Sequence, residues 1–152
     1  MRPFLLLCLI SLAGISFATA GGVYSKTVNM DFDTAYKKVY AALEENRFYV
    51  IHEIDMGDSL ARFKDKWDDY NLNKLEQQKI MIICNGWYAN QVGNADTNML
   101  ALCPMRVTLI HKQGASTALF ARPSIFASDS KALPILQEID GAVTGAIEQA
   151  LK

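Results

Sequence analysis

The chain has 152 residues, of which 51% are hydrophobic and 20% charged, and its formal net charge is −1 at pH 7. A chain of this length fits one domain with a single core. Its charges are interspersed in sign with no basic block, which argues against nucleic acid or an anionic membrane surface as the main partner.

The first twenty residues, MRPFLLLCLISLAGISFATA, carry one positive charge at Arg2, an apolar stretch over Phe4–Ile15 and the small-residue ending Ala-Thr-Ala. This layout is typical of a cleavable signal peptide, and we expect the cut after Ala20. No basic stop-transfer cluster follows, which disfavours an uncleaved anchor. We therefore predict one exported domain over residues 21–152, periplasmic or secreted, with no integral membrane segment after cleavage.

The mature chain opens with VYSKTVNM from Val23, whose alternating pattern predicts a first strand at a sheet edge. DFDTAYKKVYAALEENRF then repeats its apolar residues at intervals of three and four, which predicts an amphipathic helix. Asp31 or Asp33 can cap its start, and we expect Asn46 to end it in the left-handed conformation. FYVIHEIDM follows, and its β-branched and aromatic residues predict a second strand.

SLARFKDKWDDY returns to helical spacing through Leu60, Phe63 and Trp67, so we expect a second helix with Trp67 in the core. KIMIIC has few polar residues, which predicts a central strand buried on both faces. GWYANQVG predicts a short helix or turn, and MRVTLIHK and STALFARP flank QGA as a hairpin. ALPILQEIDGAVTGAIEQALK predicts a closing helix, with Pro134 in its first turn.

Together these elements predict an α/β (α+β) fold of two layers, with helices packed on one face of a mixed, largely antiparallel sheet. The expected order is strand, helix, strand, helix, strand, short helix, two strands and a final helix. No internal repeat, low-complexity tract or linker divides the mature chain. We therefore expect a single domain.

Several of these segments resemble the domain-of-unknown-function family 302. FDTAYKKVYAALEENRFYVIHEID is similar to the opening of that family, where an amphipathic helix leads into a strand ending on Ile-Asp. IMIICNGWYANQVGNADTNMLALCPMRVTLIHKQGASTALFARPS is similar to its centre, where a strand ends on Cys-Asn-Pro or a Gly-Asn-Pro variant and a Leu-Pro-Cys or Leu-Pro-Leu element opens a hairpin. The resemblance spans about Val23 to Leu151 and implies a compact α/β domain that dimerises, without an agreed activity.

The chain departs from the family pattern at two points. Gly86 stands where the family often has proline, and the second cysteine is Cys103, directly before Pro104, while Met105 takes the usual cysteine position. Alternate residues of a strand face opposite sides, so a shift of one residue re-aims a thiol. A disulfide or a packing role tolerates this shift better than a metal site with fixed geometry.

Removal of the signal peptide leaves two cysteines, Cys84 and Cys103, an even number in an exported protein. We expect a disulfide between them, closing a loop of about twenty residues. A redox-active thiol pair is the alternative. The histidines His52 and His111 show no metal-ligand spacing with each other or with the cysteines, so we predict neither a metal nor a cofactor. A soft metal or haem bound by cysteine and methionine stays open as an alternative.

Trp87 and Tyr88 follow the end of a strand, a position where binding residues are often found. We expect them to form, with Asn85 and Arg106, the wall and the cationic contact of a site for an unidentified small molecule or protein. No paired acid and base or activated nucleophile is recognisable, so no catalytic residue is predicted and a binding or accessory role is favoured over an enzyme. Two alternatives remain: a periplasmic thiol-redox, soft-metal or haem-handling protein, and a structural dimerisation module.

Overall fold

The computed structural model describes residues 21–152, and the expected signal peptide lies outside the described residues. The helices and strands follow the predicted order: β1 (Val23–Val28), α1 (Phe32–Glu45), β2 (Tyr49–Asp55), α2 (Met56–Ala61), β3 (Gln77–Cys84), α3 (Gly86–Ala95), β4 (Met105–Lys112), β5 (Ala115–Ala121) and α4 (Leu133–Ala150). Two short 3-10 helices, η1 (Thr97–Leu102) and η2 (Pro123–Phe126), connect these elements.

The five strands of residues 21–152 form one sheet in the order β1-β5-β4-β3-β2. Every pair of neighbours is antiparallel, so the sheet is antiparallel throughout, whereas the sequence predicted a mixed, largely antiparallel one. β1 lies at an edge, as predicted. Gln113 and Gly114 join β4 to β5 with φ angles of 52° and 76°, the positive values that a tight hairpin turn requires.

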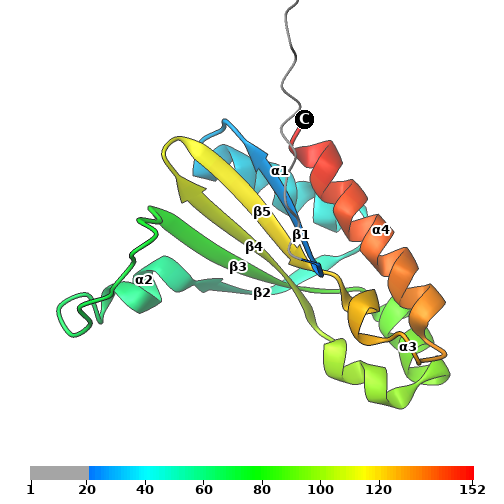
Figure 1. The fold of residues 1–152 in the computed structure, drawn as a ribbon. Helices are drawn as coiled ribbons and strands as arrows, with labels where there is room; N and C mark the ends of the chain where they lie inside the picture. Colours follow the sequence, from blue (N-terminus) through cyan, green and yellow to red (C-terminus); the bar gives the residue numbers. More distant parts are fainter. Residues whose placement is uncertain (1–20) are drawn as a thin grey trace, which may run out of the picture.

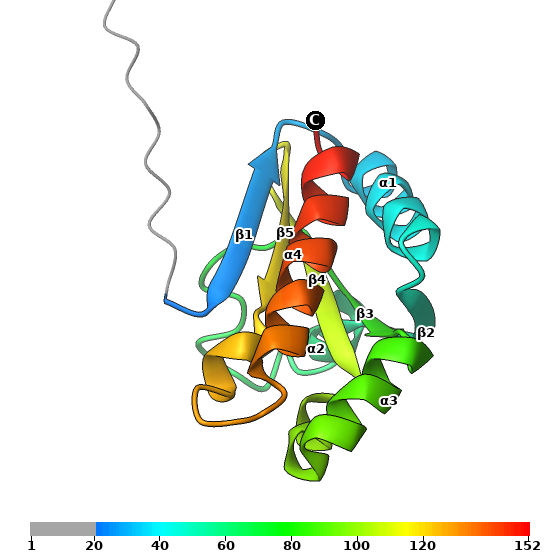
Figure 2. The same cartoon turned by 90° about the vertical axis from the view of Figure 1, so that its right-hand side faces the viewer.

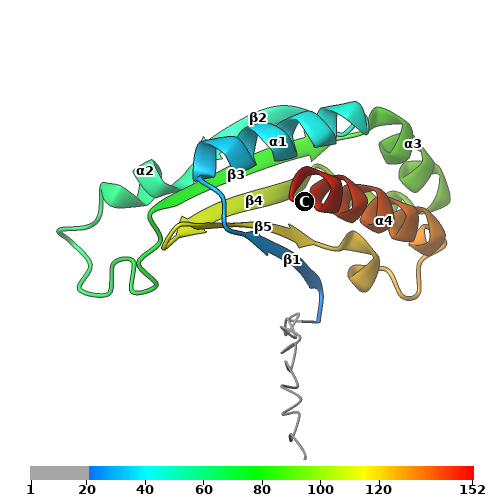
Figure 3. The same cartoon turned by 90° about the horizontal axis from the view of Figure 1, so that it is seen from above.

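The two long helices, α1 and α4, lie side by side on one face of the sheet, which confirms the two-layer α+β fold (Figures 2 and 3). Alternate residues of the strands point into this layer and form a continuous apolar core with the helices. The largest side chains that are almost fully buried in it are Phe48, Phe120, Leu43, Met81, Ile83, Leu109, Leu136, Ile139 and Ile147. α3 lies at one end of the sheet and α2 at the other (Figure 1).

The other face of the sheet carries no helix (Figure 3). β3 is therefore not buried on both faces, as its sequence predicted: Met81 and Ile83 are buried under the helices, but Ile80 and Ile82 are only half-buried. The strand register places Ile80 beside Ile54 and Thr108, and Thr108 beside Leu119. We call five half-buried aliphatic residues of strands β2 to β5 on this side the uncovered patch: Ile54, Ile80, Ile82, Ile110 and Leu119.

α1 confirms the predicted helix and shows how it is bounded. The carboxylate of Asp31 accepts a hydrogen bond of 2.9 Å from the backbone N–H of Thr34 and caps the N-terminus. The left-handed residue after the helix is Arg47, with φ 63°, so the prediction for Asn46 was wrong by one position. The Asn46 side chain donates instead to the carbonyl of Ala42 and satisfies one of the last carbonyls.

The helix predicted from SLARFKDKWDDY is shorter and begins earlier. α2 starts at Met56, is capped by the carboxylate of Asp55 and ends at Ala61. The prediction that Trp67 belongs to the core is wrong, because 44% of its surface is exposed. Among the helices of residues 21–152, none has the length and the apolar character needed to cross a bilayer.

Candidate functional site

Residues 56–76, which we call the arm, extend from the end of the sheet between β2 and β3 (Figures 1 and 3). After α2 the arm continues through turns. Asn71 and Lys74 adopt positive φ angles of 49° and 55°, and the Asn71 side chain bonds both the N–H and the carbonyl of Leu75. These contacts fix the return of the chain to β3.

Two aromatic rings of the arm stack on each other. Phe63 and Trp67 lie with their ring centroids 4.5 Å apart and their planes 7° from parallel, and the ammonium of Lys66 lies 5.7 Å from the Phe63 centroid. The spacing of four residues that predicted a helix thus brings the rings together within turns. This stack holds Trp67 at the surface of the arm, with 44% of its surface exposed.

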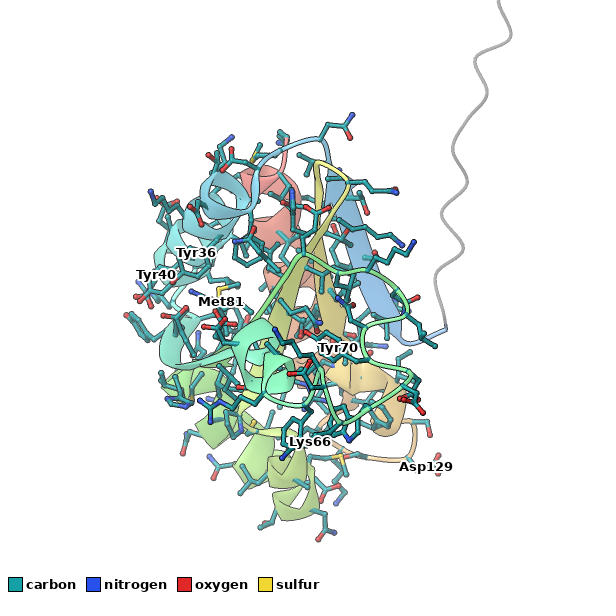
Figure 4. All side chains as sticks on the ribbon, turned by 90° about the vertical axis from the view of Figure 1, so that its left-hand side faces the viewer. Tyr36, Tyr40, Lys66, Tyr70, Met81 and Asp129 are labelled. Carbon is teal, nitrogen blue, oxygen red and sulfur yellow. The ribbon has the colours of Figure 1, made fainter. Side chains whose placement is uncertain are left out.

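A cavity of about 550 Å³ lies between the arm, the first turn of α1 and the adjoining ends of β2 and β3. Its volume falls within the range of about 300 to 1,000 Å³ that small-molecule sites occupy. Tyr70 faces the viewer in Figure 4, where the arm crosses in front of the sheet. Half of the sixteen residues that line the cavity are acidic or aromatic: Asp33, Asp55, Asp58, Asp69, Glu76, Phe32, Trp67 and Tyr70.

The carboxylates of the arm cavity have few cationic partners. Five carboxylates and one ammonium, that of Lys79, line it, so its formal charge is 1 − 5 = −4. Within residues 21–152, Lys26 and Glu148 form an ion pair, and Nε2 of His111 lies 3.7 Å from Glu76, with which it forms an ion pair only when protonated. The other four carboxylates of the cavity have no cationic partner in this range. The Lys79 ammonium lies 4.7 Å from the centroid of the Tyr36 ring on α1. The lining of this cavity thus carries an excess of negative charge.

His111 lies behind the cavity wall and contacts Glu76. Ser116 donates its proton to the Met30 carbonyl at 2.8 Å and lies 2.9 Å from Nδ1 of His111, so Nδ1 is the donor in that contact. Nε2 of His111 then faces the Glu76 carboxylate at 3.7 Å. Ser116 is fully buried and its proton is committed, so this serine, histidine and glutamate do not form a nucleophilic triad.

The carboxylates are spread around the cavity rather than gathered at one point. Within residues 21–152, no group of three or more histidine, cysteine, aspartate or glutamate side chains is arranged so that it could hold a metal ion. His52 lies on the uncovered side of β2, opposite Ile82, and is exposed, whereas His111 is buried under α1 against the Phe32 ring. The two histidines therefore belong to different sides of the sheet.

The predicted thiol pair lies at the opposite end of the sheet. Cys84 ends β3 and Cys103 precedes β4, and both are half-buried free thiols that line one small cavity of about 10 Å³. Asn85, Tyr88 and Ile139 close the same cavity. Burial raises the pKa of the Cys103 thiol, and the negative charge that Cys84 can carry adds to the rise. A raised pKa lowers the fraction of reactive thiolate.

The predicted binding residues come together only in part. Asn85 caps α3, and its side-chain oxygen accepts hydrogen bonds from the N–H groups of Trp87 and Tyr88, so this oxygen is already engaged. Tyr88 stacks on the buried Phe48 ring with 5.8 Å between centroids. Trp87 contacts Tyr88 edge-on and is 60% exposed. These aromatics form a packed corner around the helix start.

Arg106 does not join this corner. Its partner in the register of β3 is Ile82, on the uncovered side of the sheet, and its side chain is exposed. Neither Arg106 nor Trp87 lines the small cavity between the thiols. The arm cavity, in contrast, was missed by the sequence prediction. The signal that could have revealed it is Trp67 directly before Asp68, Asp69 and Tyr70, an aromatic and acidic run outside any strand.

Comparison with known proteins places the chain in a family. The model of the domain of unknown function DUF302 matches residues 24–151. The chain belongs to the DUF302 family. A similar solved structure is that of the uncharacterized conserved protein DUF302 from Bacillus stearothermophilus, with a TM-score of 0.75 and 15% identity over 88% of this chain and 100% of that one. At this identity the likeness supports the fold alone. No curated protein matches the present chain.

Proposed function

We propose that this DUF302 protein is an exported binding domain that takes a small molecule in the arm cavity. The observation that carries the proposal is the cavity itself: about 550 Å³, lined by aromatic rings and by carboxylates that lack cationic partners. The volume is that of a ligand site, and the lining combines aromatic and aliphatic side chains with charged and amide groups that can fix the orientation of a ligand. The role that we propose for the cavity is therefore binding.

The export part of the proposal rests on the signal-peptide pattern of the first twenty residues. Mass spectrometry of the protein recovered from the periplasm or the medium tests it. We expect a mature N-terminus at Gly21. A chain that still begins at Met1 and stays in the cytoplasm would contradict export.

A thermal-shift screen of a small-molecule library against the mature protein tests the binding site. Because the chain has two tryptophans, Trp67 in the arm cavity and Trp87 at the thiol end, Trp67→Ala and Trp87→Ala form a matched pair. A ligand at one hundred times its Kd stabilises by about 2.7 kcal/mol, and we expect Trp67→Ala to remove this shift while Trp87→Ala keeps it. Shifts that depend on Trp87 or Arg106 instead would move the site to the residues first predicted from the sequence.

The uncovered patch supports a further part of the proposal, a homodimer that pairs the open faces of two sheets. The patch groups five aliphatic side chains, with His52, Arg106 and Gln78 around it, which is the apolar centre and polar rim of an interface. The open face of the five strands has a flat, projected area of roughly 500 Å². A standard interface buries about 800 Å² of accessible surface on each partner.

Light scattering on the purified protein tests this pairing. We expect the mass of a dimer for the wild type and of a monomer for Ile80→Lys, because the lysine places a charge at the centre of the patch. Gln137→Lys, at an exposed position of α4 on the other side of the sheet, is the control and should stay dimeric. A monomeric wild type, or an Ile80→Lys variant that remains a dimer, would contradict the proposal.

For the thiols, the shared small cavity supports a disulfide rather than a redox centre. Cys84 and Cys103 are placed together by the ends of β3 and β4, and the raised pKa of Cys103 disfavours a nucleophilic role. We therefore propose that the pair joins these strand ends in the oxidising compartment. Thiol titration of the denatured periplasmic protein should find no free thiol, and two free thiols would contradict the disulfide.

A further inference from the structure

We infer that the ligand of the arm cavity is a small organic cation, an ammonium or guanidinium group carried by an apolar or aromatic body. This inference rests on the proposed function, because it names the chemical class of ligand for the same cavity. Three features of the cavity carry it: the charge of its lining, the type of its apolar surface and the spacing of its carboxylates.

The charge of the lining selects for a cation. Asp33 comes from the first turn of α1, Asp55 from the end of β2, Asp58 from α2 and Asp69 from the loop, so carboxylates face the cavity from several elements. None of these four has a cationic partner within residues 21–152. The field of such a cleft attracts positive ligands and repels negative ones.

The one ammonium of the lining offsets this charge only in part. Lys79 lies with its Nζ 4.7 Å from the centroid of the Tyr36 ring, so an aromatic face on α1 already accommodates it. It forms no ion pair with the carboxylate of Asp55, its register partner on β2. The Asp55 carboxylate caps α2 and Glu76 accepts a hydrogen bond from the backbone N–H of Gln113. The carboxylates left for a cation supplied from outside are those of Asp33, Asp58 and Asp69.

The apolar part of the cavity includes three aromatic rings. Phe32, Trp67 and Tyr70 line it together with the aliphatic Leu60 and Leu75. The faces of aromatic rings attract ammonium and guanidinium groups, with tryptophan the strongest, and the same rings pack against an apolar body. An inorganic cation would use the carboxylates and leave this aromatic surface without a role.

The spacing of the carboxylates also favours an organic ligand. No three acidic, histidine or cysteine side chains within residues 21–152 are arranged to surround one metal ion. Carboxylates distributed over a cavity of about 550 Å³ instead suit a ligand of several atoms whose positive charge is spread or occurs more than once. The aromatic wall and the distributed charge therefore point to the same class of compound.

The test uses Trp67 as the reporter of its own cavity. In the mature Trp87→Phe protein Trp67 is the sole tryptophan. We would titrate it with three compounds of one shape and different charge: phenethylamine, 2-phenylethanol and 3-phenylpropanoate. Tryptophan is excited at a wavelength at which their phenyl group does not absorb. We expect phenethylamine to bind at least about five-fold more tightly than the alcohol, and the carboxylate to bind weakest. Added salt should weaken the binding of the amine alone.

Two matched variants in the same background assign the effect to the cavity. Asp69→Asn removes a carboxylate of the lining, whereas Asp65→Asn removes an exposed carboxylate of the arm outside it. We expect the first to weaken phenethylamine binding about three-fold and the second to leave it unchanged. Equal weakening by both variants would show general attraction to an acidic arm and would overturn the inference.

The outcomes separate this inference from the proposed function. Equal binding of the three compounds, or tightest binding of 3-phenylpropanoate, would overturn the cationic class while leaving the arm cavity as a binding site. Binding of none of them at millimolar concentration would also overturn the class. The library screen with Trp67→Ala and Trp87→Ala then decides separately whether the cavity binds any small molecule.

Discussion

The two ends of this sheet place aromatic side chains in opposite settings. At the thiol end, Tyr88 lies against the buried Phe48, and the cavity beside it holds about 10 Å³. At the arm end, Trp67 stacks on the partly exposed Phe63 and lines about 550 Å³. An aromatic pair that follows a strand can thus complete the core, whereas one in a projecting loop can leave room for a ligand.

The largest expected difference between the two ends is in stability. Phe48→Ala removes a fully buried ring that Tyr88 stacks on, and we expect the free energy of unfolding to fall by about 3–5 kcal/mol. Phe63→Ala removes the equivalent ring of the arm, which is 37% exposed, and we expect a loss of less than about 1 kcal/mol. Urea unfolding of both variants measures this, and equal losses would contradict the contrast between a packed end and an open one.

The disulfide proposed at the thiol end sharpens the same contrast. For the oxidised protein we expect Cys84→Ser to lower the free energy of unfolding by about 3 kcal/mol, because the closed loop has about twenty residues. Addition of a reductant should lower the stability of the wild type by a similar amount and leave the variant unchanged. A wild-type protein whose stability does not respond to reductant would contradict the disulfide.

Lys79 offers a test with a smaller expected effect at the arm end, where a substitution should strengthen ligand binding. Lys79→Met removes the one ammonium of the cavity lining, so we expect phenethylamine to bind about two- to five-fold more tightly. Lys38→Met, on the exposed side of α1, is the matched control and should leave the affinity unchanged. Weaker binding by Lys79→Met would show that Lys79 contacts the ligand favourably, which contradicts a cationic ligand.

A buried carboxyl group in the helical layer makes the stability of the protein depend on pH. Asp140 on α4 is 8% exposed and accepts a hydrogen bond from the Ser124 hydroxyl on η2, and its second oxygen has no partner. Burial raises the pKa of Asp140, although the Ser124 hydrogen bonds and the charge of Arg122 act in the other direction. A carboxyl whose pKa is raised in the folded state stabilises the fold while it is protonated, and this contribution is lost as the pH rises through the folded-state pKa.

We therefore expect Asp140→Asn to reduce the decline in stability as the pH rises from acidic to neutral values. Unfolding at a series of pH values measures the effect, which should be the smallest of this set. Asp129→Asn, in the exposed turn before α4, is the control and should keep the wild-type profile. An unchanged profile for Asp140→Asn would show that this carboxyl titrates alike in the folded and unfolded chains.

The sequence predicted most of the fold because its periodic segments are long and amphipathic. α1, α4 and the β4–β5 hairpin have strong patterns, and all three lie where they were expected. The exposed side of β3 could not be predicted in this way. A run of aliphatic residues indicates that the strand is buried, but it does not indicate which helix, strand or partner covers each face.

The candidate site could be predicted less well, for a physical reason. Phe63 and Trp67 have helical spacing, yet they stack within turns after α2 has ended, since the arm has no apolar layer against which a longer helix could pack. The cavity then combines Asp33 from α1 with Asp69 from the arm, residues that are separated in the chain. Short sequence motifs identify the thiols and aromatic residues of one segment, but they do not identify residues from distant segments that line one cavity.

A chemical-shift map of the ¹⁵N-labelled mature protein titrated with phenethylamine tests most directly whether the arm cavity binds an organic cation. We predict that the largest shifts occur at backbone amides around the arm cavity, including those of Asp33, Trp67 and Tyr70, and that the indole N–H of Trp67 shifts while that of Trp87 does not. Shifts centred on Asn85, Trp87 and Arg106 would contradict the account and place the binding site at the thiol end.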